Sequence, residues 1–336
     1  MRLPRFHLLQ PDTLEEACSI LSDHGNESVV LAGGTALLVE LNQRLRSPSL
    51  VVSLKRATGW DHIATDEEGW LRIGALASVA TVAGSPLIVE RYPALAQAAR
   101  SVGVPPLRHV ATVGGNLSLD TRCIYYNQSE LWRQARPPCL KLGGDVCHVV
   151  EKGRRCLAVH QGDLAPALMA LGAAVVIMRA AGERVLPLGD FFTGDGKSPN
   201  TLGTGELLAE VRIPPAGPAS GSAYEKLRVR EAMDFPLASA AVGLRMDGRG
   251  SIGEARVVLG AMAAGPLDIT SAGAVLAGQK IGDGLNLVFD QVAQQAYERA
   301  HPADNLAMDA GYRGKMTRVL VRRALARALA SAQGAS

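Results

Sequence analysis

The chain of 336 residues is long enough for two or three domains, and its hydrophobic content of 47% is sufficient to build their cores. A formal net charge of +3 gives no bulk attraction to nucleic acid, and no apolar run approaches the roughly 20 residues of a membrane span, so neither partner is expected. The opening MRLPRFHLLQ lacks an apolar run of signal-peptide length, and five cysteines disfavour a disulfide framework, which predicts a cytoplasmic protein.

Strands and helices are interspersed in the first two thirds of the chain, where apolar residues recur at both strand and helix spacing. A strand, a Gly-Gly turn, a leucine-rich helix and another strand predict a small βαβ-like unit near the amino terminus. In chain order we first predict a helix over 12–24, a strand at 28–31, a helix carrying leucines from 37 to 45, and a strand at 49–54. Next come a strand at 71–73, a helix entered through Ser78, a helix within 92–104, and a strand leading into a second glycine turn within 109–118. After the cysteine-rich segment we predict a helix, strand, turn and strand across 163–188 and a strand within 207–215.

A Pro-, Gly- and Ser-rich stretch at 214–223 predicts a domain boundary. Beyond it, the segments 223–230, 237–247 and 252–262 have the pattern of a three-stranded antiparallel meander, and 268–279, 286–300 and 312–330 have that of helices. The last helix has apolar and basic faces, and we expect its arginines to be exposed to solvent: they are Arg313, Arg322, Arg323 and Arg327.

Two Gly-Gly segments share one physical feature. AGGTA (Ala32–Ala36) and TVGGN (Thr112–Asn116) each follow a predicted strand, and glycine lets a ligand approach the backbone without a Cβ in the way. Consecutive N–H groups near a helix N-terminus can bind the pyrophosphate of a dinucleotide, with Thr35, Thr112 and Asn116 as additional donors. A plain structural turn is the alternative for either segment, and neither fits G-x-G-x-x-G, which disfavours a Rossmann nicotinamide site.

Four of the five cysteines lie between Arg122 and Cys156: they are Cys123, Cys139, Cys147 and Cys156. Their separations of 16, 8 and 9 residues contain neither the C-x₂₋₄-C pair of a structural zinc site nor a ferredoxin run. Spacing alone therefore leaves an iron–sulfur cluster, a zinc ion and free thiols open, with His148 and His160 as nearby substitute ligands. Cys18 stands apart on a predicted helix and is expected to be a small buried hydrophobe.

A set of motifs in fixed order resembles a known family. The motifs are VVLAGGTALLVEL, IGALASVATV, ATVGGNLS, DLAPALMALGA, ELLAEVRIP, YEKLRVREAMDF, VVLGAMAAGPL and YRGKMTRVLVRRAL. Together they resemble the FAD-binding subunits of the molybdenum hydroxylase family, over nearly the whole chain. The resemblance implies an α+β protein: a two-part FAD-binding domain (FAD-binding type 2, PCMH-like) at 1–56 and 57–218, then a CO-dehydrogenase-flavoprotein-like domain of three-stranded antiparallel sheet plus helices at 219–336.

The resemblance also implies where FAD binds. It assigns both glycine segments to the diphosphate, Asp163 to the ribose or adenine end, Leu208 to the flavin pocket and Lys226 to the neighbourhood of the isoalloxazine. The residues of the two segments are Leu31, Ala32, Gly33, Gly34, Thr35 and Ala36, and Thr112, Val113, Gly114, Gly115 and Asn116. Without the resemblance, Asp163 reads as a helix N-cap and Lys226 as an exposed strand residue.

The cysteine segment resembles one branch of that family. Where most members have a short loop, this chain has an insertion at 120–158, as do the β subunits of 4-hydroxybenzoyl-CoA reductases. The four cysteines match the [4Fe–4S] ligands of that branch one by one, and YY, WR and RCLAV resemble the surrounding residues. The resemblance implies an electron relay with no catalytic residue of its own, running from a ferredoxin through [4Fe–4S] and FAD to a [2Fe–2S] small subunit and a molybdenum large subunit, in a dimer of heterotrimers.

Two alternatives remain open at this stage. A related molybdenum hydroxylase acting on another aromatic, heterocyclic or steroid substrate would use the same relay, because the substrate site lies in another subunit. A zinc-stapled nucleotide-binding module would need no iron. Residues 122–156 of the insertion carry seven basic and three acidic residues, a net charge of +4. This charge predicts a docking patch for an acidic redox protein around Arg133 and Arg136, with a solvated loop that offsets the negative charge of the cluster as the alternative.

Overall fold

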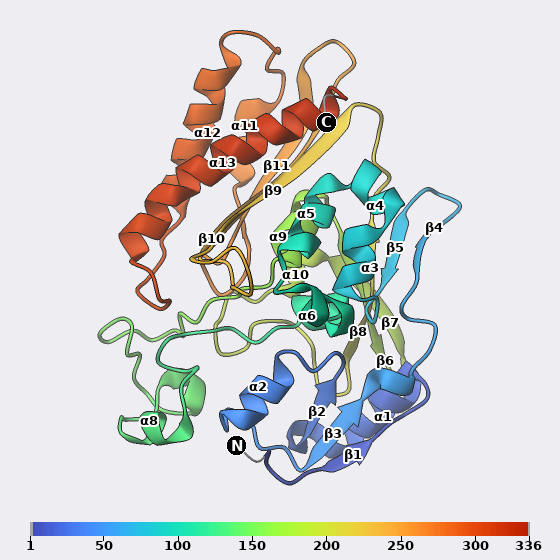
Figure 1. Cartoon of the computed structure of the whole chain (residues 1–336), viewed down its shortest axis with the longest axis vertical. Coiled ribbons are helices and arrows are strands. Elements are labelled where there is room, and N and C mark those ends of the chain that lie inside the picture. Colours follow the sequence, from blue (N-terminus) through green and yellow to red (C-terminus); the bar gives the residue numbers. More distant parts are fainter. Residues whose placement is uncertain (1–2, 335–336) are drawn as a thin grey trace.

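The computed structural model describes residues 3–334, whose strands form three sheets (Figure 1). The first sheet is parallel, in the order β1 (His7–Leu9), β3 (Leu50–Ser53), β2 (Ser28–Leu31). Helix α1 (Leu14–His24) packs on it, and its first turn is capped by Thr13, which accepts a hydrogen bond from the Glu16 amide at 3.1 Å. The predicted βαβ unit is confirmed, whereas the strand β1 was not predicted.

The second sheet has five strands, and every neighbouring pair is antiparallel. Its strands in spatial order are β4 (Ile63–Thr65), β5 (Leu71–Gly74), β8 (Leu207–Ile213), β6 (Ala174–Arg179) and β7 (Gly182–Pro187). The helices of this part are α3 (Val79–Gly84), α4 (Pro86–Arg91), α5 (Pro93–Ser101), α6 (Pro105–Val110), α7 (Val113–Leu117), α9 (Leu164–Ala170) and α10 (Leu188–Phe191). Small alanines of α5 and α9 let these helices lie close to one another and to the strands of the third sheet.

The third sheet follows the predicted boundary and is antiparallel. Strands β9 (Ser220–Leu227), β10 (Ala238–Met246) and β11 (Ile252–Gly260) form the predicted meander, but a two-residue strand, β12 (Leu267–Asp268), pairs with β11. The sheet therefore has four strands rather than three, because the chain leaving β11 turns back beside it. Helices α11 (Thr270–Leu276), α12 (Leu285–Arg299) and α13 (Ala310–Ala332) complete this part, and α13 packs along β9 and β10, as Figure 1 shows.

Two local predictions near the glycine segments were wrong. Residues 109–113 are not a strand: α6 begins at the Pro105-Pro106 pair, where proline suits the first helical turn, and only Ala111 and Thr112 are extended before α7. The helix α2 (Leu37–Asn42) stops before the expected Leu45, because Arg44 has a φ of 54°.

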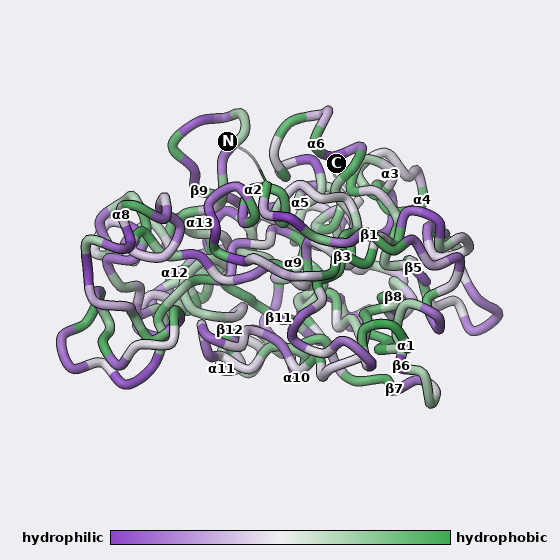
Figure 2. The backbone as a smooth tube through the Cα atoms, turned by 90° about the horizontal axis from the view of Figure 1, so that it is seen from below, coloured by the Kyte–Doolittle hydropathy of each residue, from purple (hydrophilic) through white to green (hydrophobic). Residues whose placement is uncertain are grey.

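The insertion protrudes from the second part, and it contains one short helix, α8 (Glu130–Gln134), and a 3₁₀ turn at Leu140–Leu142 (Figure 1). Its two ends are joined by backbone hydrogen bonds of 2.8 Å in each direction between Arg122 and Val159. Figure 2 shows hydrophilic segments mainly in peripheral loops and hydrophobic segments running through the interior. Within residues 3–334, no helix combines the length and the apolarity that crossing a membrane requires.

Candidate functional site: two glycine turns and a cysteine cage

The two glycine segments are neighbours in the fold. An added Cβ at Gly33 would lie 1.8 Å from the carbonyl oxygen of Val110 and 3.1 Å from the Cα of Ala111, so only glycine permits this approach. Gly34 has a φ of 75°, a backbone conformation that favours glycine. Because Ala111 directly precedes the second segment, both segments line one place, as a shared ligand requires.

The second segment is a capped short helix rather than a free turn. Gly114 packs against Ala75, whose Cβ would lie 2.8 Å from an added Cβ, and Gly115 donates its amide hydrogen to Thr112 Oγ1 at 3.1 Å. Asn116 is buried and its Oδ1 accepts from the amide of Leu164 at 3.1 Å, at the start of α9. In both bonds the side chain of Thr112 or Asn116 acts as the acceptor. The hydroxyl hydrogen of Thr112 and the side-chain amide hydrogens of Asn116 therefore keep their capacity to donate.

Asp163 and Lys226 form one buried pair. Lys226 Nζ lies 3.0 Å from the Asp163 carboxylate and also donates to the carbonyls of Ser101 at 2.9 Å and Asp234 at 3.0 Å. The Tyr224 hydroxyl donates to Asp163 Oδ1 at 2.6 Å. Burial raises the pKa of Asp163, although Lys226 and the hydrogen bonds oppose that rise, and burial lowers the pKa of Lys226.

This pair bears on both local interpretations. Asp163 occupies the N-cap position of α9, as expected, but its side chain makes no capping hydrogen bond. The Lys226 side chain is only 4% exposed, so the expectation of an exposed strand residue was wrong. The expected roles of Asp163 at the ribose or adenine end and of Lys226 near the isoalloxazine stay predictions, and the contact between the two side chains would place both near one part of a bound FAD. Spacing in the sequence could not reveal this pairing.

Leu208 lies in β8 beside the second glycine segment. Its side chain is buried, and the next residue, Ala209, accepts a hydrogen bond from Ala75 at 2.8 Å. Ala75 in turn accepts from the amide of Gly114 at 2.8 Å. Leu208 is thus held in the strand layer directly behind the second segment.

All four insertion cysteines line a single cavity that opens to solvent, which we call the cysteine cage. Its remaining wall consists of Tyr125, Tyr126, Leu140, Lys141, His148, Val149, Leu157 and Ala158. All five cysteines of the chain are free thiols. Within residues 3–334, no group of three or more His, Cys, Asp or Glu side chains is arranged to hold a single metal ion.

The thiols of the cage differ in their surroundings. Burial raises the pKa of Cys123 to about 11, and hydrogen bonds from the backbone amides of Tyr125 and Tyr126 oppose this rise. Burial also raises the pKa of Cys156, against a hydrogen bond from the Ala158 amide. Amides directed at sulfur stabilise a thiolate, and a bound metal would displace the thiol proton.

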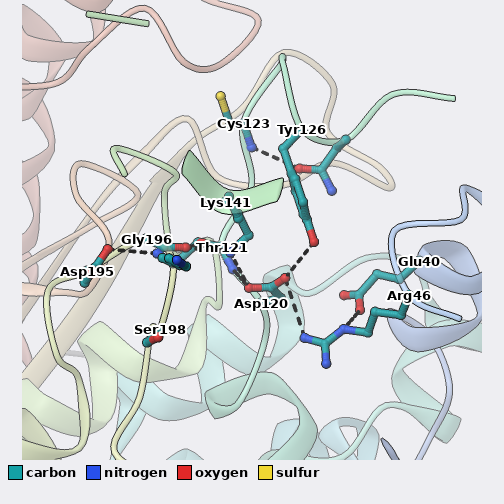
Figure 3. A network of polar contacts seen from close by, with 12 residues as sticks. Glu40, Arg46, Asp120, Thr121, Cys123, Tyr126, Lys141, Asp195, Gly196 and Ser198 are labelled. Atoms are coloured by element: carbon teal, nitrogen blue, oxygen red, sulfur yellow. Dashed lines mark hydrogen bonds and ion pairs between the residues drawn. The ribbon is translucent and has the colours of Figure 1, made fainter. Parts of the chain in front are cut away.

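A buried lysine forms part of the cage wall (Figure 3). The Lys141 side chain is 4% exposed, and its ammonium donates to Asp120 at 2.6 Å, Thr121 at 2.7 Å and the carbonyl of Gly196 at 2.5 Å. Its Nζ also lies 5.0 Å from the centre of the Tyr126 ring. This ammonium and its partners were not anticipated from the sequence, since Lys141 and Gly196 are 55 positions apart.

The same network reaches the first glycine segment. Asp120 accepts from the Tyr126 hydroxyl at 3.5 Å and lies 3.6 Å from Arg46 Nη2. Arg46 pairs in turn with Glu40 of α2 at 2.9 Å, as the chain of dashed lines in Figure 3 shows. The cage wall and the helix that follows AGGTA are therefore connected through charged side chains.

The predicted basic patch is much weaker than its sequence suggests. Arg122 stacks on Phe235 at 4.3 Å, Lys141 is buried, and Arg133 donates to the carbonyls of Gln43 at 3.0 Å and Arg44 at 2.9 Å. The exposed charges that remain are Arg136, Lys152, Arg154 and Arg155 against Glu130, Asp145 and Glu151. Their net charge is +1 rather than +4, because three of the basic side chains hold the insertion in place.

Comparison with known proteins accounts for this arrangement. A family model described as "FAD binding domain in molybdopterin dehydrogenase" matches residues 4–216. The chain belongs to the FAD-binding medium-subunit family of molybdenum hydroxylases. A second model, "CO dehydrogenase flavoprotein C-terminal domain", matches residues 222–328 of this medium-subunit chain, so the expected α+β fold is confirmed.

Individual members of the medium-subunit family are similar over most of their length. The aldehyde oxidoreductase FAD-binding subunit of Escherichia coli is 32% identical over 288 residues, which are 81% of this chain and 83% of that protein. The carbon monoxide dehydrogenase medium chain of Afipia carboxidovorans is 30% identical over 98% of both chains. A carbon monoxide dehydrogenase structure from Hydrogenophaga pseudoflava superposes with a TM-score of 0.80 at 26% identity, covering 98% of this chain and 99% of that chain.

Membership of the medium-subunit family confirms two expectations in general form. FAD is the cofactor of the matching domain, and the family consists of subunits of molybdenum-containing oxidoreductases. The aldehyde oxidoreductase subunit is named for FAD, and neither of these two relatives is named for iron, so an iron–sulfur cluster in the insertion goes beyond them.

Proposed function

We propose that this chain is the electron-transfer subunit of a molybdenum hydroxylase-type complex and that it holds both FAD and a [4Fe–4S] cluster. The observation that carries the proposal is the convergence of all four insertion cysteines on one cavity, in a chain of an FAD-binding family. Together the two groups supply one- and two-electron redox chemistry. The polypeptide binds and tunes them, and we assign no catalytic residue to it.

For FAD, we propose that residues 31–36 and 112–116 bind the diphosphate. Support comes from the contact of Gly33 with Val110, which brings the two segments together. Leu208 would supply apolar surface, and the Asp163–Lys226 pair would meet a single part of the FAD, where its buried charges fix the orientation of a polar group.

For the cluster, we propose Cys123, Cys139, Cys147 and Cys156 as ligands. Four thiols are a donor set that suits iron–sulfur, and their distribution around one cavity suits a group that takes one ligand at each corner. A single zinc ion would need all four sulfurs within about 2.3 Å of one point. The buried ammonium of Lys141 stands beside the sulfurs and offsets negative charge there.

In finer detail, we propose a cytoplasmic 4-hydroxybenzoyl-CoA reductase, in which electrons pass from a ferredoxin through this chain to a [2Fe–2S] small subunit and a molybdenum large subunit, assembled as a dimer of heterotrimers. Support is the resemblance of the insertion to that branch of the family, residue by residue at the cysteines. The alternative is the same relay in a related enzyme, since relatives are named for nicotinate, aldehyde and carbon monoxide. With an exposed charge of only +1, docking of the donor would depend on contact more than on long-range steering.

The test compares two cysteine variants purified without oxygen. Cys139→Ser should lose iron and keep one FAD per chain, whereas Cys18→Ala, which removes a buried thiol far from the cage, should keep both. Loss of FAD with retention of iron in Cys139→Ser would contradict the assignment. One zinc per chain and no visible absorption from iron would favour the zinc-stapled module. Dehydroxylation of 4-hydroxybenzoyl-CoA by the purified complex, supplied with reduced ferredoxin, tests the substrate.

A further inference from the structure

Arg313 is the largest side chain that the fold buries completely. The expectation that it is exposed on the last helix was wrong, because loops from distant parts of the chain cover it. It donates to the carbonyls of Leu237 at 2.8 Å, Ala261 at 2.7 Å and Ala303 at 3.0 Å and to Asn305 Oδ1 at 3.2 Å. Burial lowers its pKa to about 10, which leaves it charged at neutral pH, and among residues 3–334 no carboxylate pairs with it.

Asn305 passes this anchoring on to the insertion. Its side chain is buried, and because Arg313 can only donate, Oδ1 must face Arg313 and Nδ2 must face the carbonyl of Leu157, to which it donates. The backbone carbonyl of Asn305 accepts from the amide of Ile124 at 2.9 Å. One residue of the third part therefore binds both ends of the insertion.

Two cage cysteines are adjacent to these bonds. Ile124 follows Cys123 and Leu157 follows Cys156 in the sequence. At Arg122 and Val159 the two segments bond directly to one another. Two residues further into the insertion, at Ile124 and Leu157, they are connected through Asn305, which bonds to both. Asn305 therefore bridges the two segments beside both cysteines.

We propose that Asn305, held by Arg313, is a positioning residue that sets the separation of Cys123 and Cys156 for the cluster. This role rests on the cluster proposed above and extends the site to the third part of the chain, which supplies no thiol to the cage. A cluster accepts its ligands at fixed corners, so a change in that separation alters ligand fit and the hydrogen bonds to sulfur, which tune its potential.

Two variants of Asn305 separate positioning from simple loss of stability. Asn305→Ala removes both side-chain bonds. Asn305→Asp keeps an acceptor for Arg313 but cannot donate to Leu157 at neutral pH, so it isolates the bond to the insertion. Gln161→Met is the matched control, because it removes a buried amide that donates to the Pro236 carbonyl at 2.7 Å without touching the insertion segments.

The experiment measures iron and FAD per chain, the rate of iron release to a ferrous chelator, and the electron paramagnetic resonance spectrum and midpoint potential of the reduced cluster. Both Asn305 variants should release iron at least tenfold faster and show an altered spectrum and potential with one FAD per chain, while Gln161→Met behaves as wild type. If the wild-type protein contains iron and Asn305→Asp leaves the release rate, the spectrum and the potential unchanged, the positioning role of Asn305 is overturned while the cluster stands. Wild-type protein without iron would overturn the proposed cluster and this role with it.

Discussion

Replacing Gly33 with alanine tests the contact that joins the two glycine segments. The new methyl carbon would lie 1.8 Å from the carbonyl oxygen of Val110 and 2.7 Å from its carbonyl carbon, and no flexible side chain is available to move aside. To bring this contact to 3.0 Å, the shortest that real Cβ atoms show, the first segment and α6 must separate by at least about 1.2 Å (3.0 − 1.8). Overpacking of this kind costs roughly 1–3 kcal/mol of unfolding free energy, and the displaced amides should weaken FAD binding by about tenfold or more.

The assay for Gly33→Ala is FAD titration of the apoprotein, with urea unfolding alongside. Gly84→Ala is the matched control, because an added Cβ at Gly84 meets no heavy atom within 4 Å and its φ is not positive. The control should bind FAD as wild type does. If Gly33→Ala binds FAD with an affinity within twofold of wild type, the inference that this contact shapes the FAD site is refuted.

Three further predictions concern the buried charges and the insertion. Lys226→Met leaves the Asp163 carboxylate buried without its cation and should lower the unfolding free energy in urea by about 3–5 kcal/mol. Adding Asp163→Asn should restore part of this loss; equal losses in the single and double variants would count against the pairing. Burial lowers the pKa of His160 to about 4, below its unfolded value. The unfolding free energy of the wild type should therefore fall by roughly 3 kcal/mol as the pH falls from about 6.5 to 4. His160→Gln should remove this loss, and parallel stability–pH profiles of the two proteins would contradict it. Arg133→Ala should free α8 from α2 and speed trypsin cleavage within the insertion, without lowering the urea midpoint; unchanged cleavage would show that these carbonyl contacts do not restrain it.

The elements with strong hydrophobic periodicity could be predicted from the sequence. The βαβ unit, the meander and the last three helices follow from apolar spacing and turn residues, which act locally. The strand expected at 109–113 failed because the neighbouring prolines start a helix and because Gly114 packs against Ala75, a residue far away in the sequence.

The site was predictable in its residue types and not in its contacts. Four clustered cysteines indicated a common ligand, but their convergence depends on how Lys141 ties the insertion to Gly196. Basic residues ordinarily indicate solvent exposure, which concealed the buried guanidinium of Arg313. Nothing in the local sequence of Asn305 indicates that it binds both ends of the insertion, because that contact is made between distant parts of the chain.

We propose that this chain carries a second redox group besides its flavin. The most direct measurement is the content of iron, acid-labile sulfide, zinc and FAD in wild-type protein purified without oxygen. We expect about four irons and four sulfides with one FAD per chain, since one cluster would occupy the four-cysteine cage. A protein with one FAD and no iron, or with a single zinc ion in place of iron, would contradict it.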